Sequence, residues 1–211
     1  SIGPVTIDKS RFDKEEMGRN ALYMPDAEAA KKAQAYLEGC MKEKNSSGGM
    51  VECVIKGVPA GIGEPAFEKL DANLAKAVFS IGAVKSFEVG AGIAAASSDG
   101  LHNNDAYRMD EEGNVKKKTN HSGGITGGIS DGAPILIRAA FKPTPSVAAV
   151  PETVNRQGEN IEISIKGRHD PIIVPRAVVV VESMAALVVL DAMLGSMTTR
   201  MDAVKGFFKN L

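Results

Sequence analysis

An Arg-His-Asp triplet, Arg168 to Asp170, separates two of the most apolar segments of this 211-residue chain. The run IEISI before it alternates apolar and polar residues, and residues 177–194 after it are almost continuously apolar. An arginine can bind a carboxylate or a phosphate through two parallel hydrogen bonds. Asp170 could orient His169 or act as a base. The alternative is an ion-paired turn in which Asp170 caps the next helix, although Pro175 places the expected helix start several residues later.

A second set of polar residues follows an apolar strand pattern in RAAFKPTPS, residues 138–146. Lys142 lies four residues after Arg138, on the same face of the expected strand, and a Pro-Thr-Pro turn then carries the hydroxyls of Thr144 and Ser146. Cations beside hydroxyls suit the binding of a phosphate. An edge strand with solvated cations is an equally good interpretation of this segment in isolation.

A glycine-rich segment, NHSGGITGGISDG, covers residues 120–132 and contains two Gly-Gly pairs. Glycines let the backbone approach a flat or anionic ligand, and successive free N–H groups can form a small anion site. The spacing matches neither common nucleotide-binding glycine motif. On composition alone, close packing of backbone segments through small residues is the better interpretation.

Composition limits the classes of function. Apolar residues make up 44% of the chain, charged residues 24%, and the net charge is −1, so no global bias toward nucleic acid exists. His102, His121 and His169 are widely separated, which predicts no metal site. Cys40 and Cys53 also lack ligand spacing and are expected to be free thiols in a reducing compartment. With no visible signal peptide, we expect a cytoplasmic protein.

Helical and extended patterns alternate in mixed order along the chain. This order predicts an α+β fold in which largely antiparallel sheets pack against helices, in one domain over residues 1–211. A long Gly/Asn-rich loop is expected at about 97–134. The expected helices cover residues 25–44, 66–80 and 177–194, and the expected strands cover 50–57, 83–92 and 133–143, with two further extended runs around a turn at 156–160.

The expected helix at residues 177–194 is long and apolar enough to raise the question of a membrane span. It contains Glu182 and Asp191, and a carboxylate at the centre of a membrane helix costs about 2.5–3.5 kcal/mol. Pro175 and Gly195 are the usual residues at the ends of a soluble helix. We therefore predict a buried core helix and no membrane partner.

Together these segments resemble the chorismate synthase family. GRHDP followed by RAVVVVES is similar to the family's C-terminal signature, and NHSGGITGGISDGAPI and AFKPTPS are similar to its flavin-side segments. The upstream run GVPAGIGEP also matches a family stretch, so four ordered matches cover almost the whole chain. Ile172 replaces a small residue or cysteine, and Ser122 replaces a frequent alanine. The resemblance implies a chorismate synthase-like β-α-β sandwich, present here in part.

Members of this family are lyases that convert 5-enolpyruvylshikimate 3-phosphate to chorismate and phosphate by a 1,4-anti elimination, in the shikimate pathway of aromatic amino acid biosynthesis. They require reduced FMN. The resemblance implies that Asp170 is catalytic beside the flavin and that Arg168 lies between flavin and substrate, binding both. It also implies a homotetramer and a link to NADP, with the source of reducing equivalents left open. The residues expected to bind the cofactor are Asn120, Ser122, Lys142, Ser146, Arg168 and His169.

The family's N-terminal part, which carries two catalytic histidines and an Arg-rich substrate motif, has no counterpart here. The chain also starts at Ser1 with residues typical of the middle of a domain. We therefore expect the C-terminal portion of a longer protein, inactive alone, acting on a small anionic substrate. The alternatives are a non-catalytic flavin- or nucleotide-binding module and a purely structural oligomerisation domain.

Overall fold

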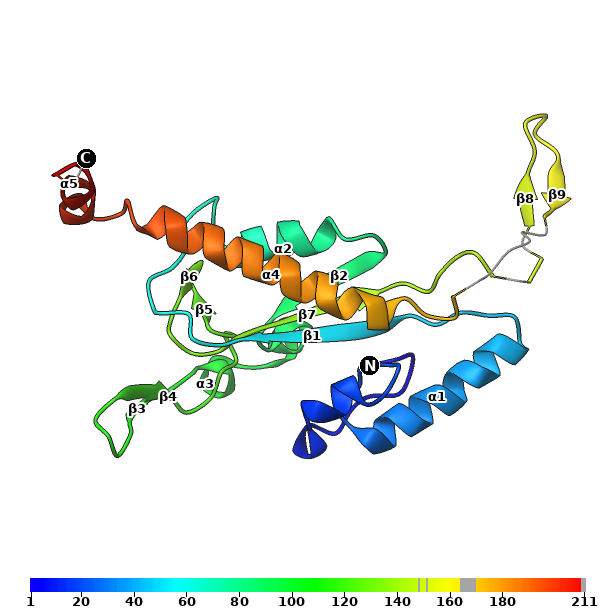
Figure 1. The fold of residues 1–211 in the computed structure, drawn as a ribbon, viewed down its shortest axis with the longest axis horizontal. Helices are drawn as coiled ribbons and strands as arrows, with labels where there is room; N and C mark the ends of the chain where they lie inside the picture. Colours follow the sequence, from blue (N-terminus) through cyan, green and yellow to red (C-terminus); the bar gives the residue numbers. More distant parts are fainter. Residues whose placement is uncertain (148, 151, 164–169, 210–211) are drawn as a thin grey trace. The chain divides into compact units, whose positions relative to one another are not determined.

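A computed structural model describes the chain except residues 148, 151, 164–169 and 210–211 (Figure 1). Its α-helices are α1 (Ala27–Lys42), α2 (Leu70–Phe79), α3 (Gly100–Asn103), α4 (Val174–Ser196) and α5 (Met201–Lys209), and its short 3-10 helices are η1 (Lys9–Arg11), η2 (Glu15–Gly18) and η3 (Gly92–Ser97). Its strands are β1 (Gly49–Ile55), β2 (Val84–Val89), β3 (Tyr107–Met109), β4 (Val115–Lys117), β5 (Ile125–Thr126), β6 (Ile129–Ser130), β7 (Ile135–Phe141), β8 (Glu152–Val154) and β9 (Asn160–Glu162).

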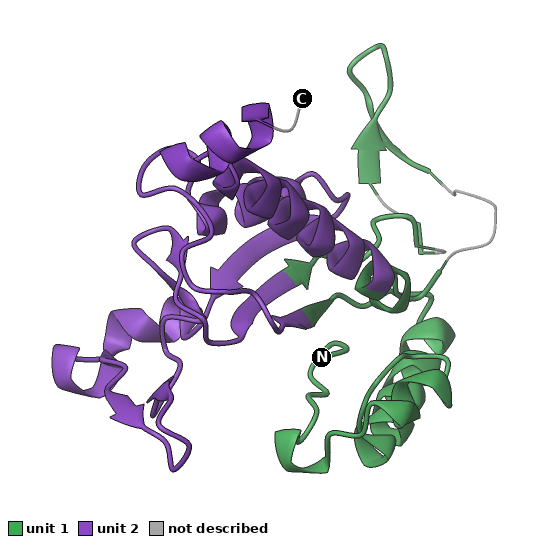
Figure 2. Ribbon diagram, turned by 60° about the vertical axis from the view of Figure 1, so that its left-hand side comes forward, with its two compact units in different colours: residues 1–51, 140–178 green, residues 52–139, 179–211 purple. Residues whose placement is uncertain are grey.

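The chain forms two compact units, each built from two stretches of sequence (Figure 2). Unit 1 comprises Ser1–Val51 and Ala140–Val178, and unit 2 comprises Glu52–Ala139 and Val179–Leu211. The boundaries fall inside β1, β7 and α4 rather than in flexible linkers.

The strands form one three-stranded sheet with the order β1–β7–β2 and three two-stranded hairpins. The hairpins β3–β4, β5–β6 and β8–β9 are antiparallel. The predicted α+β class is therefore confirmed. Strand β7 alternates as its sequence predicts, because its buried face is made by Ile135, Ile137, Ala139 and Phe141.

Helix α1 of unit 1 was expected from residue 25, with Asp26 in its first turn, and it begins at Ala27. Asp26 is its N-cap, and the carboxylate accepts hydrogen bonds from the backbone N–H groups of Glu28 and Ala29 at 3.0 and 3.2 Å. Hydrogen bonds from the Arg11 guanidinium hold the pKa of Asp26 well below its ordinary value. The expected apolar stripe is correct except at its end, where Met41 is exposed and Cys40 is buried.

Helix α2 of unit 2 starts later than the sequence predicts. Leu70, Leu74 and Val78 are fully buried on one face, as expected from their helical spacing. Phe67 was expected on the same stripe, but it is 94% exposed. Its φ of 51° is incompatible with a right-handed helix, so the helix begins only at Leu70.

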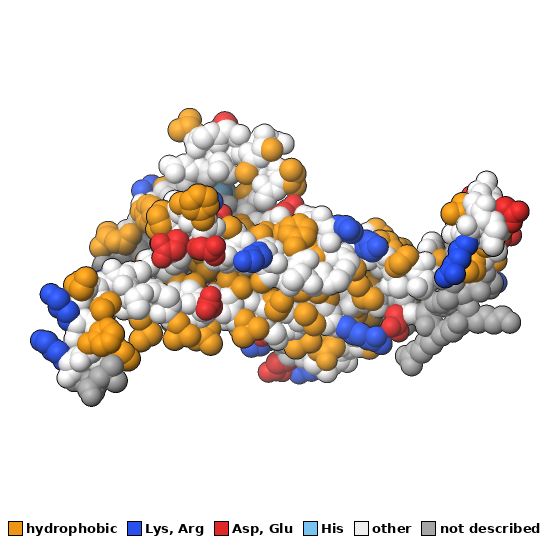
Figure 3. Space-filling model, turned by 90° about the horizontal axis from the view of Figure 1, so that it is seen from above, with side chains coloured by type: hydrophobic (Ala, Val, Ile, Leu, Met, Phe, Trp, Pro, Cys, Tyr) orange, Lys and Arg blue, Asp and Glu red, His pale blue; other side chains and the backbone are white. Residues whose placement is uncertain are grey.

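Helix α4 has one packed stripe and one open face. Val181, Ala185 and Val189 recur every four residues and are buried. Figure 3 shows hydrophobic side chains on the surface of the molecule. Several apolar residues of α4 are exposed: Val179, Val180, Leu187, Leu190, Met193 and Leu194. The prediction of a buried core helix therefore holds for one stripe only, because 22% of its most apolar stretch is buried. By length and composition alone, α4 is the one helix in the described residues that could cross a membrane.

The segment at 97–134, expected as one long loop, contains α3 and the hairpins β3–β4 and β5–β6. It closes tightly on the end of β2 in unit 2. The amide of Ala91 donates to the carbonyl of His121 at 2.7 Å, and the amide of Leu136 donates to the carbonyl of Gly123 at 3.1 Å. The short strands explain why no sustained periodicity is visible in the sequence.

We expect Gly90→Ala to destabilise the protein by at least about 3 kcal/mol. Gly90 has a φ of 58°, and a Cβ there would collide with the backbone of residues 121–123. Gly57→Ala is the matched control, because Gly57 has a φ of 80° but open space around it. Urea unfolding should show a cost of only about 1–2 kcal/mol for the control. Equal costs would mean that the backbone contact at Gly90 is unimportant.

Candidate functional site

The residues predicted to bind ligands fall in both units. Asn120 and Ser122 belong to unit 2, whereas Lys142, Ser146 and Asp170 belong to unit 1. Arg168 and His169 lie outside the described residues. Within the part of the chain that the structure describes, no group of three or more His, Cys, Asp or Glu side chains could hold a metal ion.

Residues 46–49, here called the anchor segment, connect the two unit 1 segments that carry predicted site residues. The hydroxyl of Ser46 donates to the carbonyl of Thr144 at 2.7 Å. The amide of Ser47 donates to the carbonyl of Pro171 at 2.8 Å. The segment bearing Lys142 and the segment bearing Asp170 are therefore fixed to two consecutive residues of one loop.

Glycine is required in the anchor segment. A Cβ at Gly48 would lie 2.5 Å from the carbonyl oxygen of Phe141 and 3.2 Å from Cδ of Pro143. Ser46 and Ser47 beside it are themselves buried. The close approach keeps the segment that begins at Lys142 in direct backbone contact with the anchor segment.

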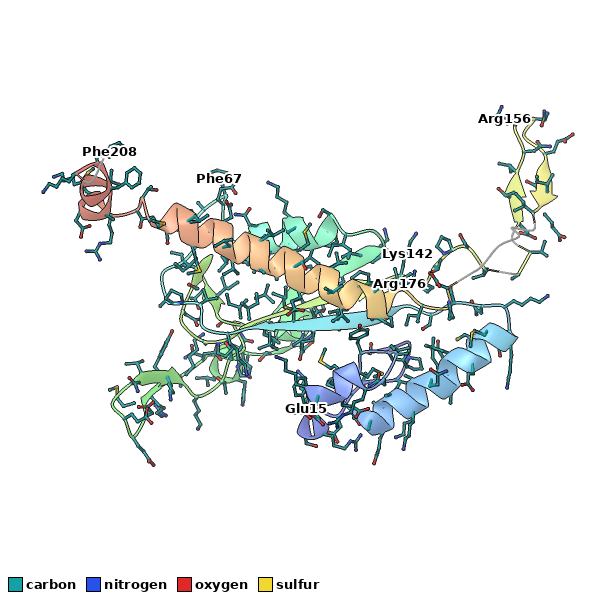
Figure 4. The ribbon with its side chains drawn as sticks, in the orientation of Figure 1. Glu15, Phe67, Lys142, Arg156, Arg176 and Phe208 are labelled. Atoms are coloured by element: carbon teal, nitrogen blue, oxygen red, sulfur yellow. The ribbon has the colours of Figure 1, made fainter. Side chains whose placement is uncertain are left out.

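Two groups in residues 142–146 remain available for a ligand. The hydroxyl oxygen of Thr144 is buried and has no hydrogen-bond partner among the residues that the structure describes. A buried hydroxyl without a partner is costly, so a ligand atom that satisfied it would be favoured. Lys142 is exposed at the end of β7 (Figure 4), and no ion pair joins it to another described residue. A cation beside an unsatisfied hydroxyl suits an anionic oxygen.

Asp170 forms a two-pronged ion pair with Arg176 in the first turn of α4. Nη1 of Arg176 lies 2.8 Å from Oδ2 of Asp170, and Nη2 lies 3.3 Å from Oδ1. The interpretation of Asp170 as an ion-paired turn residue is thus correct in part, but α4 begins at Val174 and Asp170 does not cap it. The fork holds the carboxylate in one orientation.

In unit 2, residues 120–124, here called the glycine turn, are closed by their own hydrogen bonds. The side chain of Asn120 donates to the carbonyl of Pro134 at 2.8 Å and accepts from the amide of Gly124 at 2.9 Å. The amides of His121 and Ser122 donate to Asp105, and the amide of Gly123 donates to the carbonyl of Asn120. The idea of an anion site made of free N–H groups is therefore wrong here. Close backbone packing through glycine is correct.

A buried cluster of Asp105, Lys117 and Asp131 lies against the glycine turn. The three side chains are 7%, 6% and 9% exposed. Nζ of Lys117 lies 3.3 Å from Asp105, 2.5 Å from Asp131 and 2.5 Å from the hydroxyl of Ser122. Ser122, predicted to contact flavin, thus has its hydroxyl engaged inside the protein.

Hydrogen bonds outweigh burial in setting the charges of the buried cluster. Burial raises the pKa of Asp105, but the amides of Ser122 and His121 donate to it and lower that pKa well below its ordinary value. Burial likewise opposes ionisation of Lys117 and Asp131, yet their mutual contact leaves the pKa of Lys117 raised and that of Asp131 lowered. All three groups are therefore charged at neutral pH, with a net charge of −1.

Arg138 is used inside the sheet rather than for a ligand. Its guanidinium lies 2.9 Å from Glu52 of β1, 2.9 Å from Glu88 of β2 and 2.7 Å from the carbonyl of Gly90. It joins the central strand β7 to both neighbours. The phosphate interpretation is therefore not supported for Arg138, and the alternative of an edge strand with solvated cations is wrong because β7 is the central strand.

Sequence reasoning missed Arg176 and the buried cluster. Arg176 lies six residues after Asp170, which is not the spacing of helical neighbours, so only the turn before α4 brings them together. A weak signal for Lys117 exists in the KKK run at 116–118, which lies between Asp105 and Asp131 in the sequence, but charge runs usually form solvated faces.

The class that the structure defines is an α+β protein in which one anchor segment holds the segments of Lys142, Thr144 and Asp170. Comparison with known proteins makes the assignment specific. The chorismate synthase family model matches residues 1–194, and the chain belongs to that family.

Individual relatives agree with this assignment. The chain is 62% identical over 211 residues to the chorismate synthase of Agathobacter rectalis and 59% identical over 209 residues to that of Lachnoclostridium phytofermentans. A solved structure described as a crystal structure of chorismate synthase is similar with a TM-score of 0.76 at 29% identity, covering 100% of this chain and 60% of that one. The chain spans about 57% of the length of both curated relatives.

Proposed function

We infer that the protein of which this chain forms part converts 5-enolpyruvylshikimate 3-phosphate to chorismate and phosphate. Family membership supports the reaction, and the anchor segment supports the assignment of Lys142 and Asp170 to one site. A C–O bond to phosphate breaks and a proton leaves a ring carbon, so that one new double bond forms without net oxidation. The reaction needs a cationic site for the anions and a group that moves a proton.

The residues of unit 1 fit a phosphorylated flavin. The unpartnered hydroxyl of Thr144 and the cation of Lys142 provide a donor and a charge within three residues, and Ser146 adds a second hydroxyl. Bound reduced FMN would lend electron density to the substrate and take it back. Lys142, Thr144 and Ser146 would hold the phosphate group of the cofactor.

Asp170 is the group in the described residues proposed to move the proton. Its carboxylate oxygens could accept a proton from the reacting centre and return it. Arg176 restricts the rotation of this carboxylate, and the hydrogen bond of Ser47 to Pro171 fixes the backbone next to it. Asn120 and Ser122 remain proposed flavin neighbours, acting through the shape of the glycine turn.

We expect Thr144→Val to stabilise the ligand-free protein by about 1 kcal/mol, because it replaces an unsatisfied buried hydroxyl with an apolar group of the same shape. The same substitution should weaken FMN binding about threefold to tenfold through the lost hydrogen bond. Thermal unfolding and a flavin titration measure the two effects. The control is Thr153→Val on the exposed hairpin β8–β9. A loss of stability at Thr144 without FMN would contradict the proposed donor role.

The direct test uses the full-length protein without oxygen, with reduced FMN and 5-enolpyruvylshikimate 3-phosphate. Chorismate and free phosphate should appear in equal amounts. FMN binding without any product would favour the alternative of a non-catalytic flavin module, and failure to bind FMN would contradict both. We further propose that residues 1–211 alone are inactive and that the full-length protein is a cytoplasmic homotetramer.

A further inference from the structure

The role of the buried cluster needs an explanation of its own, because none of its three charged residues is a predicted site residue. Its three charged side chains come from separate places: Asp105 follows α3, Lys117 ends β4, and Asp131 follows β6. A salt bridge whose side chains are largely buried contributes little net stability, because removing charges from water costs about as much as their attraction returns. Such a cluster is better explained by what it positions.

The cluster determines the conformation of the glycine turn. Asp105 accepts from the amides of His121 and Ser122 at 2.7 and 2.9 Å and from the hydroxyl of Thr119 at 2.7 Å. Lys117 binds the hydroxyl of Ser122, and the amide of Asp131 donates to the carbonyl of Gly124 at 3.0 Å. Each member of the cluster therefore contacts the glycine turn directly.

We propose that Lys117 is a positioning residue, which holds Asp105 and Asp131 together so that the glycine turn keeps the shape that receives the flavin. Without the ammonium group, two buried carboxylates would face each other with no cation between them. The repulsion would open the turn at Ser122 and Gly124. This inference rests on the proposed function, because it takes the glycine turn as part of the flavin site.

The test compares Lys117→Met with Lys117→Arg and Lys116→Met in the full-length protein, using oxidised FMN as the probe. Lys116 is the adjacent residue of β4. Its side chain is exposed, and its Nζ lies 2.6 Å from the half-buried Asp110. Lys117→Met should weaken FMN binding at least about tenfold, since small displacements of a binding group are costly. Lys117→Arg should recover most of the affinity, and Lys116→Met should bind as wild type.

A purely structural role predicts a different pattern. It would lower the unfolding temperature of Lys117→Met but leave the Kd for FMN and the visible spectrum of bound flavin unchanged below that temperature. FMN affinity within twofold of wild type in a folded Lys117→Met protein would overturn the inference. A folded Lys117→Arg protein that does not recover the affinity would also overturn it. Equal impairment of Lys116→Met would overturn it as well, because that result would show a general effect of the hairpin.

A milder variant covers the case in which Lys117→Met does not fold. Asp131→Asn removes one charge and keeps one of the two carboxylate oxygens, so it can accept from Lys117 or from the amide of Ala133 but not from both as Asp131 does. It should weaken FMN binding by an intermediate factor, and wild-type affinity would overturn the inference. If wild-type protein fails to bind FMN or to form chorismate, the proposed function fails first, and that result is separate from any effect of Lys117.

Discussion

Asp170→Asn in the full-length protein should lower kcat about 10²- to 10⁴-fold, which is the usual contribution of a positioned acid or base. The substituted amide keeps the size of the side chain and one oxygen for Arg176, but it cannot take up a proton. FMN binding should change much less than turnover. Chorismate formation at saturating FMN and substrate measures the effect, and a flavin titration measures the binding.

The matched control is Asp202→Asn. Asp202 in α5 also forms a fork with an arginine, at 3.1 and 2.7 Å from Arg200, but it follows the residues that match the family model. Its substitution should leave kcat unchanged. Full activity of Asp170→Asn would show that Asp170 does not transfer the proton, regardless of the activity of Asp202→Asn.

Lys142→Ala should weaken the binding of FMN about tenfold to a hundredfold, the range expected for one lost charge-assisted hydrogen bond. The remaining affinity should depend less on ionic strength, since one attractive charge has been removed. Titrations at low and high salt measure both effects.

Lys31→Ala provides the comparison for Lys142, because Lys31 is an exposed lysine on α1 of the same unit. It should bind FMN as wild type does at every salt concentration. An identical salt dependence for Lys142→Ala and wild type would show that Lys142 does not meet the anion.

Much of the fold was predictable because it depends on periodic patterns. The period of two in β7 places Ile135 and Phe141 on the buried face, and helical spacing finds Leu70 and Leu74. Some of the errors lie at the ends of elements. Met41 is exposed because a repeat of 3.6 residues returns the buried stripe to Cys40.

The candidate site was less predictable for a physical reason. Lys142 and Asp170 stood out as charges next to apolar runs, and that signal is local. The roles of Arg176 and Lys117 depend on ion pairs that form only when the chain folds. No spacing along the sequence predicts those contacts. Sequence patterns identify charged residues that interrupt an apolar pattern, such as Lys142 and Asp170. They do not identify the residues that position other groups, such as Arg176 and Lys117.

The anchor segment has a consequence for the length of the connection between α1 and β1. Surface connections usually tolerate inserted residues, because the entropic cost of a longer loop rises slowly. Here the hydrogen bonds to the carbonyls of Thr144 and Pro171 come from the neighbouring residues Ser46 and Ser47. Gly48 packs directly against the backbone of Phe141, so the loop has no room to shift. One extra residue would displace both hydrogen bonds at once, so we expect this loop to keep a fixed length. The turn of the β8–β9 hairpin is free to vary in length.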